Sequence, residues 1–152
     1  VTSMMTYWYP GVFEAIRIIR KHLPGVPVVL GGVYATLCTD HARHFSGADH
    51  VITHDGELSV LNLLLALWGK APEFVPDQDD LDSLPYPCFD LVPHPRYVCI
   101  RASKGCPYRC TYCASGYLCR RHRQVIRMVA DKESMELFGR CHLKVHIILR
   151  NI

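Results

Sequence analysis

The sequence lacks any apolar run long enough to cross a membrane. Its longest apolar run, Leu58 to Trp68, contains Ser59 and Asn62 and falls well short of the roughly 20 residues that a membrane-spanning helix needs. The first ten residues also lack the basic start, apolar stretch and small-residue cleavage site of a secretory signal. We therefore expect a cytoplasmic protein with no membrane span.

A strong charge of either sign is also lacking. The formal net charge is +3 over 152 residues, and the basic residues are scattered apart from Arg120-Arg121-His122-Arg123, which argues against a nucleic-acid partner. That short run could bind an anionic group of a substrate, but we favour a solvated loop. With 49% hydrophobic and 20% charged residues, the composition is that of a folded globular protein.

Cysteine, in contrast, is abundant, with eight in the chain. Because no secretory signal accompanies them, metal-binding thiols in a reducing compartment fit this number better than a disulfide framework does. The sequence also starts without an initiator methionine and ends just after an apolar, strand-like segment. We therefore expect a fragment of a longer protein.

The N-terminal half alternates short apolar runs with helical periodicity. Runs suited to buried strands lie at 1–5, 26–30 and 48–53, and helical patterns lie at 10–23, 39–45 and 55–67. Alternating strands and helices predict a parallel sheet covered on both faces, and hence an α/β fold. In the last helix, Leu58, Leu61, Leu64 and Leu65 are expected in the core.

Composition divides the chain into three segments: the α/β pattern at 1–68, a Pro- and Asp-rich linker at 69–96, and a second unit at 97–152. The second unit reads as one βαβ unit, with a strand at 97–102, a Cys- and Arg-rich loop at 103–123, a helix at 125–138 and a strand at 143–149. Its long loop leaves the carboxyl end of the first strand, where parallel α/β folds place their chemistry.

The most informative motif is Gly105-Cys106-Pro-Tyr-Arg-Cys110-Thr-Tyr-Cys113. Three thiolates in so short a segment can hold one face of a 4Fe–4S cluster and leave the fourth iron without a protein ligand. An open coordination position is what distinguishes a reactive metal site from a closed structural one.

This spacing, with Tyr112 directly before the last cysteine, resembles the defining motif of the radical S-adenosylmethionine superfamily. The resemblance implies that Cys106, Cys110 and Cys113 hold the cluster, and that Tyr112 lies near the adenine of S-adenosylmethionine. It also implies that this cofactor binds the open iron and is cleaved by one electron, supplied by a flavodoxin or ferredoxin, to a 5′-deoxyadenosyl radical. Gly105 would let the chain turn tightly against the cluster.

Two other interpretations of the cysteines stay open. One is a structural zinc module that uses Cys110 and Cys113 together with Cys106 or Cys119. The other is an electron-transfer iron–sulfur protein, which would need a fourth protein ligand such as Cys119.

The N-terminal half carries a second resemblance. Ser3-Met-Met, followed after 25 residues by Gly31-Gly32, is similar to the cobalamin-binding domain that precedes the cluster domain in a large class of these enzymes. The resemblance implies that Ser3, Gly31 and Gly32 lie at the ends of adjacent strands and leave room for the nucleotide tail of the corrin. The alternative is a domain without cobalamin, in which the glycine pair merely permits a tight turn.

Together the two resemblances imply the C-terminal part of a doubly wound, flavodoxin-like cobalamin-binding domain, followed by the first βαβ unit of a partial (β/α) barrel. Methyl transfer is the commonest activity of this class, and we expect the fragment alone to be inactive. Tyr7, Trp8 and Tyr9 could stack on a corrin ring or pack within their own loop. One departure from the family is His54-Asp55, which replaces the first two residues of its usual turn before Gly56-Glu57.

Overall fold

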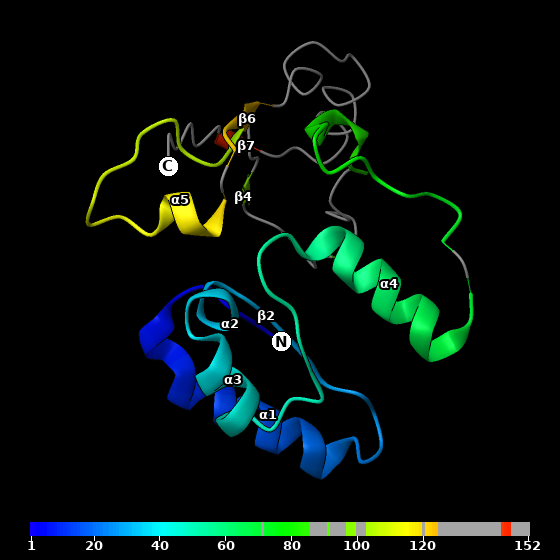
Figure 1. The fold of residues 1–152 in the computed structure, drawn as a ribbon. Helices are drawn as coiled ribbons and strands as arrows, with labels where there is room; N and C mark the ends of the chain where they lie inside the picture. The colour runs from blue at the N-terminus through cyan, green and yellow to red at the C-terminus, as the bar shows by residue number, and fades with distance from the viewer. Residues whose placement is uncertain are drawn as a thin grey trace. The chain divides into compact units, whose positions relative to one another are not determined.

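The computed structural model describes residues 1–70, 72–85, 91, 97–99, 103–119, 121–124 and 144–146. The chain forms two compact units, Val1–Glu73 and Phe74–Ile152, and Figure 1 shows the helices and strands of each. The helix predicted at 125–138 lies outside the described residues. The predicted division into domains and linker stays a prediction.

Three short parallel strands form the sheet of the first unit. β1 (Thr2–Ser3), β2 (Val29–Gly32) and β3 (His50–Val51) are hydrogen-bonded in that order. Both pairings are parallel, so the carboxyl ends of the strands meet at one edge of the sheet. The predicted α/β character is confirmed, although each strand is shorter than its apolar run.

Helices join and cover these strands. The unit contains a 3-10 turn, η1 (Thr6–Trp8), and four helices, which are α1 (Tyr9–His22), α2 (Val33–Leu37), α3 (Thr39–Phe45) and α4 (Gly56–Trp68). Three of the four helices follow the predicted periodicity. α2 was not predicted, because a helix of five residues is too short to show an amphipathic repeat.

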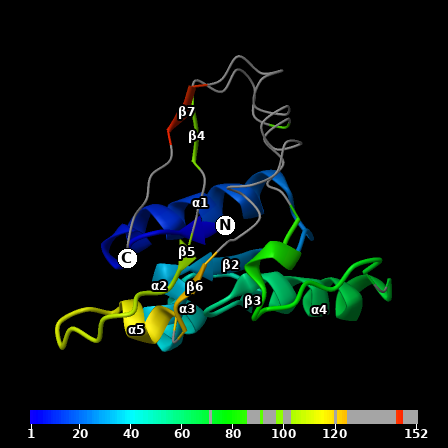
Figure 2. The ribbon, with the colours of Figure 1, turned by 90° about the horizontal axis from the view of Figure 1, so that it is seen from above.

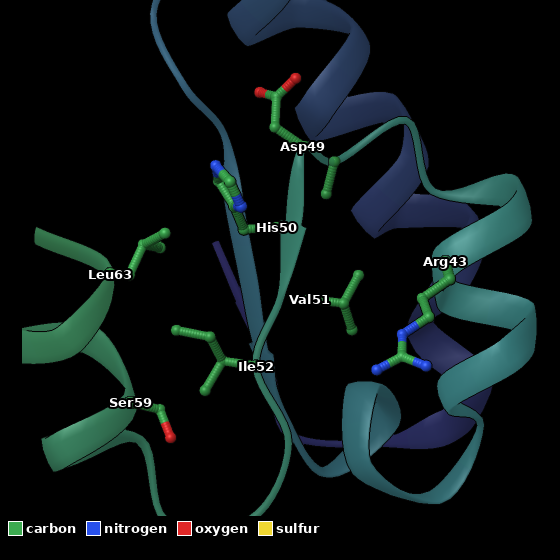
Figure 3. Close-up of a pocket in the computed structure, with 8 residues that line it drawn as sticks. Arg43, Asp49, His50, Val51, Ile52, Ser59 and Leu63 are labelled. Atoms are coloured by element: carbon green, nitrogen blue, oxygen red, sulfur yellow. The ribbon is translucent and has the colours of Figure 1, made fainter. Parts of the chain in front are cut away.

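Alternation along β2 sends successive side chains to opposite faces of the sheet. Val28 and Leu30 belong to a buried core with residues of α1, α2 and α3, whereas Val29 and Gly31 face a cavity beneath α4. In Figure 2 the strands β2 and β3 lie between α1 and α4. Figure 3 shows the same division at β3, where Ile52 points towards α4 and Val51 towards α3.

α4 packs loosely against its face of the sheet. The prediction that Leu64 and Leu65 are core residues is wrong, because each is 41% exposed, whereas Leu58 and Leu61 are partly buried. The sheet beneath them is narrow and presents Gly31, which has no side chain to fill the space. In the described residues no helix is long and apolar enough to span a bilayer.

An acidic side chain links the sheet to α1. The Asp49 carboxylate accepts hydrogen bonds from Arg20 at 2.8 Å and from the Val28 amide at 2.7 Å. The Arg20 guanidinium, followed by the Val28 amide, holds the pKa of Asp49 below its usual value. These bonds fix the turn that leads into β3.

The described residues of the second unit form two separate strand pairs. β4 (Tyr97–Cys99) and β7 (Lys144–His146) pair in parallel, as the predicted βαβ unit requires. β5 (Ser103–Lys104) and β6 (Arg123–Gln124) pair antiparallel within what the sequence presents as a loop. A short helix, α5 (Ser115–Leu118), and a 3-10 turn, η2 (Leu81–Ser83), complete the described elements.

Two adjacent glycines give a direct test of this packing. Gly32 has φ +95°, and a Cβ there would lie 2.4 Å from the Ser3 carbonyl oxygen, whereas a Cβ on Gly31 would meet only the Ile52 carbonyl oxygen at 3.7 Å. We predict that Gly32→Ala lowers the free energy of unfolding by more than about 2 kcal/mol. Gly31→Ala should change it by less than about 1 kcal/mol. Urea denaturation measures both, and equally small effects would contradict the described register.

Candidate functional site

The first candidate site lies at the carboxyl ends of β1 and β2. The register places Ser3 beside Gly32 and Thr2 beside Gly31. The structure thus brings together the three residues that the sequence assigned to cofactor binding in this unit. This edge is where open parallel α/β sheets bind their ligands.

The three residues play different parts at that edge. Ser3 is buried and its hydroxyl donates to the Met5 carbonyl at 2.9 Å, so its polar atom is used within the chain. Gly31 and Gly32 both line the cavity beneath α4. The close approach of Ser3 by itself requires a glycine at position 32. The space around Gly31, in contrast, is open to a ligand.

The cavity beneath α4 has a volume of about 420 Å³. Its lining is mainly apolar and comes from the sheet and from the facing side of α4, including Val29, Ile52, Val60, Leu63, Leu67 and Trp68. Size and lining are those of a small-molecule pocket, in which an apolar wall carries a few polar groups.

Sequence reasoning missed two residues here: His54, which lines the cavity, and Thr36, which is hydrogen-bonded to the His54 backbone. Thr36 is buried, and its hydroxyl donates to the Gly32 carbonyl and accepts from the His54 amide, both at 2.9 Å. His54 lines the cavity with φ +57°, a left-handed conformation that is uncommon outside glycine. The departure at His54-Asp55 was a signal for His54, whereas nothing in the sequence marked Thr36.

The sequence left open whether the aromatic residues after β1 stack on a ligand or pack within the protein, and the structure treats them differently. Tyr9 packs against Phe13 and Tyr34, with ring centroids 5.4 and 6.2 Å apart. Tyr7 and Trp8 contact each other edge to face, and their side chains are 68% and 51% exposed. Tyr7 and Trp8 therefore present more free ring surface than Tyr9, which is 40% exposed.

A second cavity, of about 480 Å³, lies along the outer edge of β3 (Figure 3). Arg43 of α3, Ser59 of α4, and Asp49 and His50 contribute its polar groups. It contains none of the residues that the sequence predicted for a site.

The second candidate site is the loop that follows β5. Cys110 and Cys113 are exposed free thiols, and Cys106 is a partly exposed one. The Cys113 amide donates to the Cys110 carbonyl at 3.1 Å, which closes a tight turn between these two cysteines. Tyr112 lies in that turn and is 91% exposed.

The surroundings of Cys113 favour the ionised form of its thiol. The Cys113 sulfur lies 3.1 Å from the Ser115 hydroxyl. Hydrogen bonds from the Ser115 hydroxyl, and secondarily from the Ser115 amide, lower the pKa of the Cys113 thiol. A lower pKa favours the thiolate, which is the form that binds metals.

Cys119 has a different environment. Its sulfur lies 3.2 Å from the Arg121 carbonyl oxygen and 3.5 Å from an Arg123 guanidinium nitrogen. It therefore contacts the base of the loop near β6, and both contacts are made with residues that follow it closely in sequence.

The donor set suits an iron–sulfur cluster, which is held by cysteine thiolates. Three thiols with at least partial exposure lie on one short loop. Among the residues that the structure describes, however, no three Cys, His, Asp or Glu side chains gather closely enough to hold a metal ion. The residues thus fit a cluster by their chemistry and not by a preformed arrangement.

The base of the loop is closely packed. Gly105 has φ +85°, and a Cβ there would lie 2.3 Å from the Arg121 carbonyl oxygen. The solvated loop favoured for the basic run is wrong for Arg123, which is partly buried and donates to the Gln78 carbonyl. Arg121 is largely exposed but pairs with Asp79 at 2.7 Å.

Two curated proteins of Synechocystis sp. are similar to the chain. An uncharacterized methyltransferase is 30% identical over 118 residues, which are 74% of this chain and 22% of that protein. An anaerobic magnesium-protoporphyrin IX monomethyl ester cyclase is 28% identical over 149 residues, which are 80% of this chain and 30% of that protein. Both relatives are enzymes by name. The chain spans less than a third of either, and no family profile or solved structure matches it.

The Cys113 environment predicts a pH dependence of thiol reactivity. Because its pKa is lowered, Cys113 in the metal-free protein should react with iodoacetamide at a lower pH than a free cysteine does. Ser115→Ala removes the hydroxyl bond and should move the onset of alkylation to higher pH, while Ser103→Ala serves as the control. Peptide mass spectrometry across pH measures this, and an unchanged onset in Ser115→Ala would contradict the described contact.

Proposed function

We propose that the chain is part of a radical S-adenosylmethionine enzyme in which Cys106, Cys110 and Cys113 hold a 4Fe–4S cluster. The observation that carries the proposal is the cysteine triplet on one accessible loop, which follows β5 and lies downstream of β4, the strand paired in parallel with β7. The similarity to a methyltransferase and a cyclase supports an enzymatic function. A flavodoxin or ferredoxin would serve as the electron donor.

Once bound, the cluster would supply the electron that cleaves S-adenosylmethionine to a 5′-deoxyadenosyl radical. The residues of this chain provide ligands and orientation. The turn at Cys110–Cys113 holds two sulfurs on one tight bend, and Ser115 favours the thiolate of the second. The exposed ring of Tyr112 is available to pack against the adenine of the cofactor.

The position of Cys119 favours three protein ligands over four. An electron-transfer cluster would need a fourth protein ligand such as Cys119, and a structural zinc site would use Cys106 or Cys119 together with Cys110 and Cys113. The Cys119 sulfur instead contacts Arg121 and Arg123 at the base of the loop. This supports a cluster whose fourth iron is left for the cofactor.

The first unit would bind cobalamin at the carboxyl edge of its sheet. Gly31, Gly32 and the apolar cavity of about 420 Å³ beneath α4 offer space for the nucleotide tail, and Tyr7 and Trp8 offer free ring surface after β1. Cobalamin would carry a methyl group, so methyl transfer is the reaction that we propose. A related radical reaction, as the name of the cyclase relative suggests, is the second candidate.

The cluster proposal is tested by anaerobic reconstitution with iron and sulfide. The wild-type protein should turn brown and bind four irons and four sulfides per chain. Cys110→Ala should lose most of this iron, while Cys119→Ala should retain it. A colourless protein that binds zinc tightly, or a Cys119→Ala variant that fails to assemble the cluster, would contradict the proposal.

The cobalamin proposal is tested at Gly31. Gly31→Leu places a large side chain towards the cavity and should weaken hydroxocobalamin binding by about tenfold or more, because overfilling a packed site costs about 1–3 kcal/mol. Gly11→Leu, where a Cβ meets nothing within 4 Å, is the matched control and should bind as the wild type does. Equilibrium dialysis measures both, and unaltered binding in Gly31→Leu would sink the assignment.

A further inference from the structure

We propose that the turn Asp77–Ser83, called here the acidic turn, is a clamp that holds the base of the cysteine loop closed before a cluster binds. Asp79, Arg121 and Arg123 are then positioning residues for the cysteine ligands. The proposal rests on the proposed cluster function and concerns contacts within the second unit only.

The acidic turn is organised by its own hydrogen bonds. The Ser83 hydroxyl lies 2.7 Å from the Asp80 carbonyl oxygen and 3.0 Å from the Asp77 carbonyl oxygen, and it accepts from the Asp77 amide at 2.8 Å. The carboxylates of Asp77 and Asp80 accept from the amides two residues on. Leu81, which lies within the turn, is buried. The turn is therefore held by several hydrogen bonds of its own.

The acidic turn makes two contacts with the segment 121–124, which contains β6. The Asp79 carboxylate pairs with the Arg121 guanidinium at 2.7 Å, and the Gln78 carbonyl accepts from Arg123. A second nitrogen of Arg123 lies 3.5 Å from the Cys119 sulfur. One arginine thus connects the acidic turn to the end of the cysteine loop.

The other end of the loop is held through the same strand. In the antiparallel register of β5 and β6, Lys104 lies opposite Arg123 and Ser103 lies opposite Gln124. The Arg121 carbonyl packs against Gly105. Cys106 follows directly. Both ends of the loop therefore meet at the segment that the acidic turn grips, and Figure 2 shows β5 and β6 side by side where the yellow loop closes.

The strand pair cannot hold the loop alone. β5 and β6 are two residues each, whereas an isolated two-stranded hairpin is marginal even when longer. Contacts from outside the pair must supply the remaining stability. Closing the loop in advance also reduces the entropy that the three cysteine ligands lose when a cluster binds.

The test compares three clamp variants with a matched control. Arg121→Gln and Asp79→Asn break the exposed ion pair, and Arg123→Met removes the donors while keeping the aliphatic stem. Arg17→Gln breaks a similar exposed pair, Arg17–Glu14 at 2.6 Å in α1, outside the second unit. The reversed pair Asp79→Arg with Arg121→Asp keeps the interaction with its charges exchanged.

The first readout needs no cluster and is amide hydrogen exchange of residues 103–124 in the metal-free protein. Breaking the exposed pair should speed exchange about threefold, and Arg123→Met about tenfold because a charged hydrogen bond is lost. The second readout is the rate at which the reconstituted protein loses iron to a chelator, which should rise in the same order. The control should match the wild type in both, and the reversed pair should restore both.

Exchange rates equal to those of the wild type in all three variants would overturn the clamp. Faster exchange with unchanged iron loss would overturn the positioning role. A wild-type protein that assembles no cluster would overturn the proposed function instead, and hydrogen exchange would still decide whether the acidic turn holds the loop closed.

Discussion

Both candidate sites depend on one steric constraint, a backbone carbonyl that lies too close to a glycine for any Cβ to fit. The Ser3 carbonyl lies against Gly32 at the sheet edge, and the Arg121 carbonyl lies against Gly105 at the base of the cysteine loop. Each glycine has a positive φ, which other residues adopt only at a cost. These contacts bring together segments that are far apart in sequence.

The two sites differ in how much of each is preformed. At the sheet edge, parallel pairing and the Thr36 hydrogen bonds to Gly32 and His54 fix the walls of a cavity. In the second unit the stem of the loop is fixed, while the described thiols do not gather at one point. This arrangement suits a large inorganic cluster. The base of the loop is fixed, and the cysteines can come together when the cluster binds, because metal binding orders its own ligands.

Sequence reasoning was strongest where the pattern is local. Periodicity located α1, α3 and α4, and the glycine pair correctly marked the end of β2 beside Ser3. It failed where tertiary contacts decide the structure. β5 and β6 are two residues each and pair across the whole cysteine loop. No hydrophobic pattern in the sequence predicts this pairing. Arg123 looked like part of a solvated run until its contacts with Gln78 and Cys119 were seen.

The same distinction applies to the candidate ligands. The spacing of Cys106, Cys110 and Cys113 is visible in the sequence, as is the departure at His54. The hydrogen bond that lowers the pKa of Cys113 depends on how the backbone turns between Cys113 and Ser115. The buried hydroxyl of Thr36 depends on the positions of Gly32 and His54, to which it is hydrogen-bonded. Leu64 and Leu65 were misjudged as core because helical spacing identifies an apolar face without measuring the width of the sheet beneath it.

The central claim is a cluster held by three cysteines, with one iron open to S-adenosylmethionine. Electron paramagnetic resonance of the reduced, reconstituted protein tests it most directly. We predict a 4Fe–4S signal that changes when S-adenosylmethionine is added, because the cofactor binds the open iron. A signal that stays the same at saturating cofactor, or that shows all four irons held by the protein, would contradict the account.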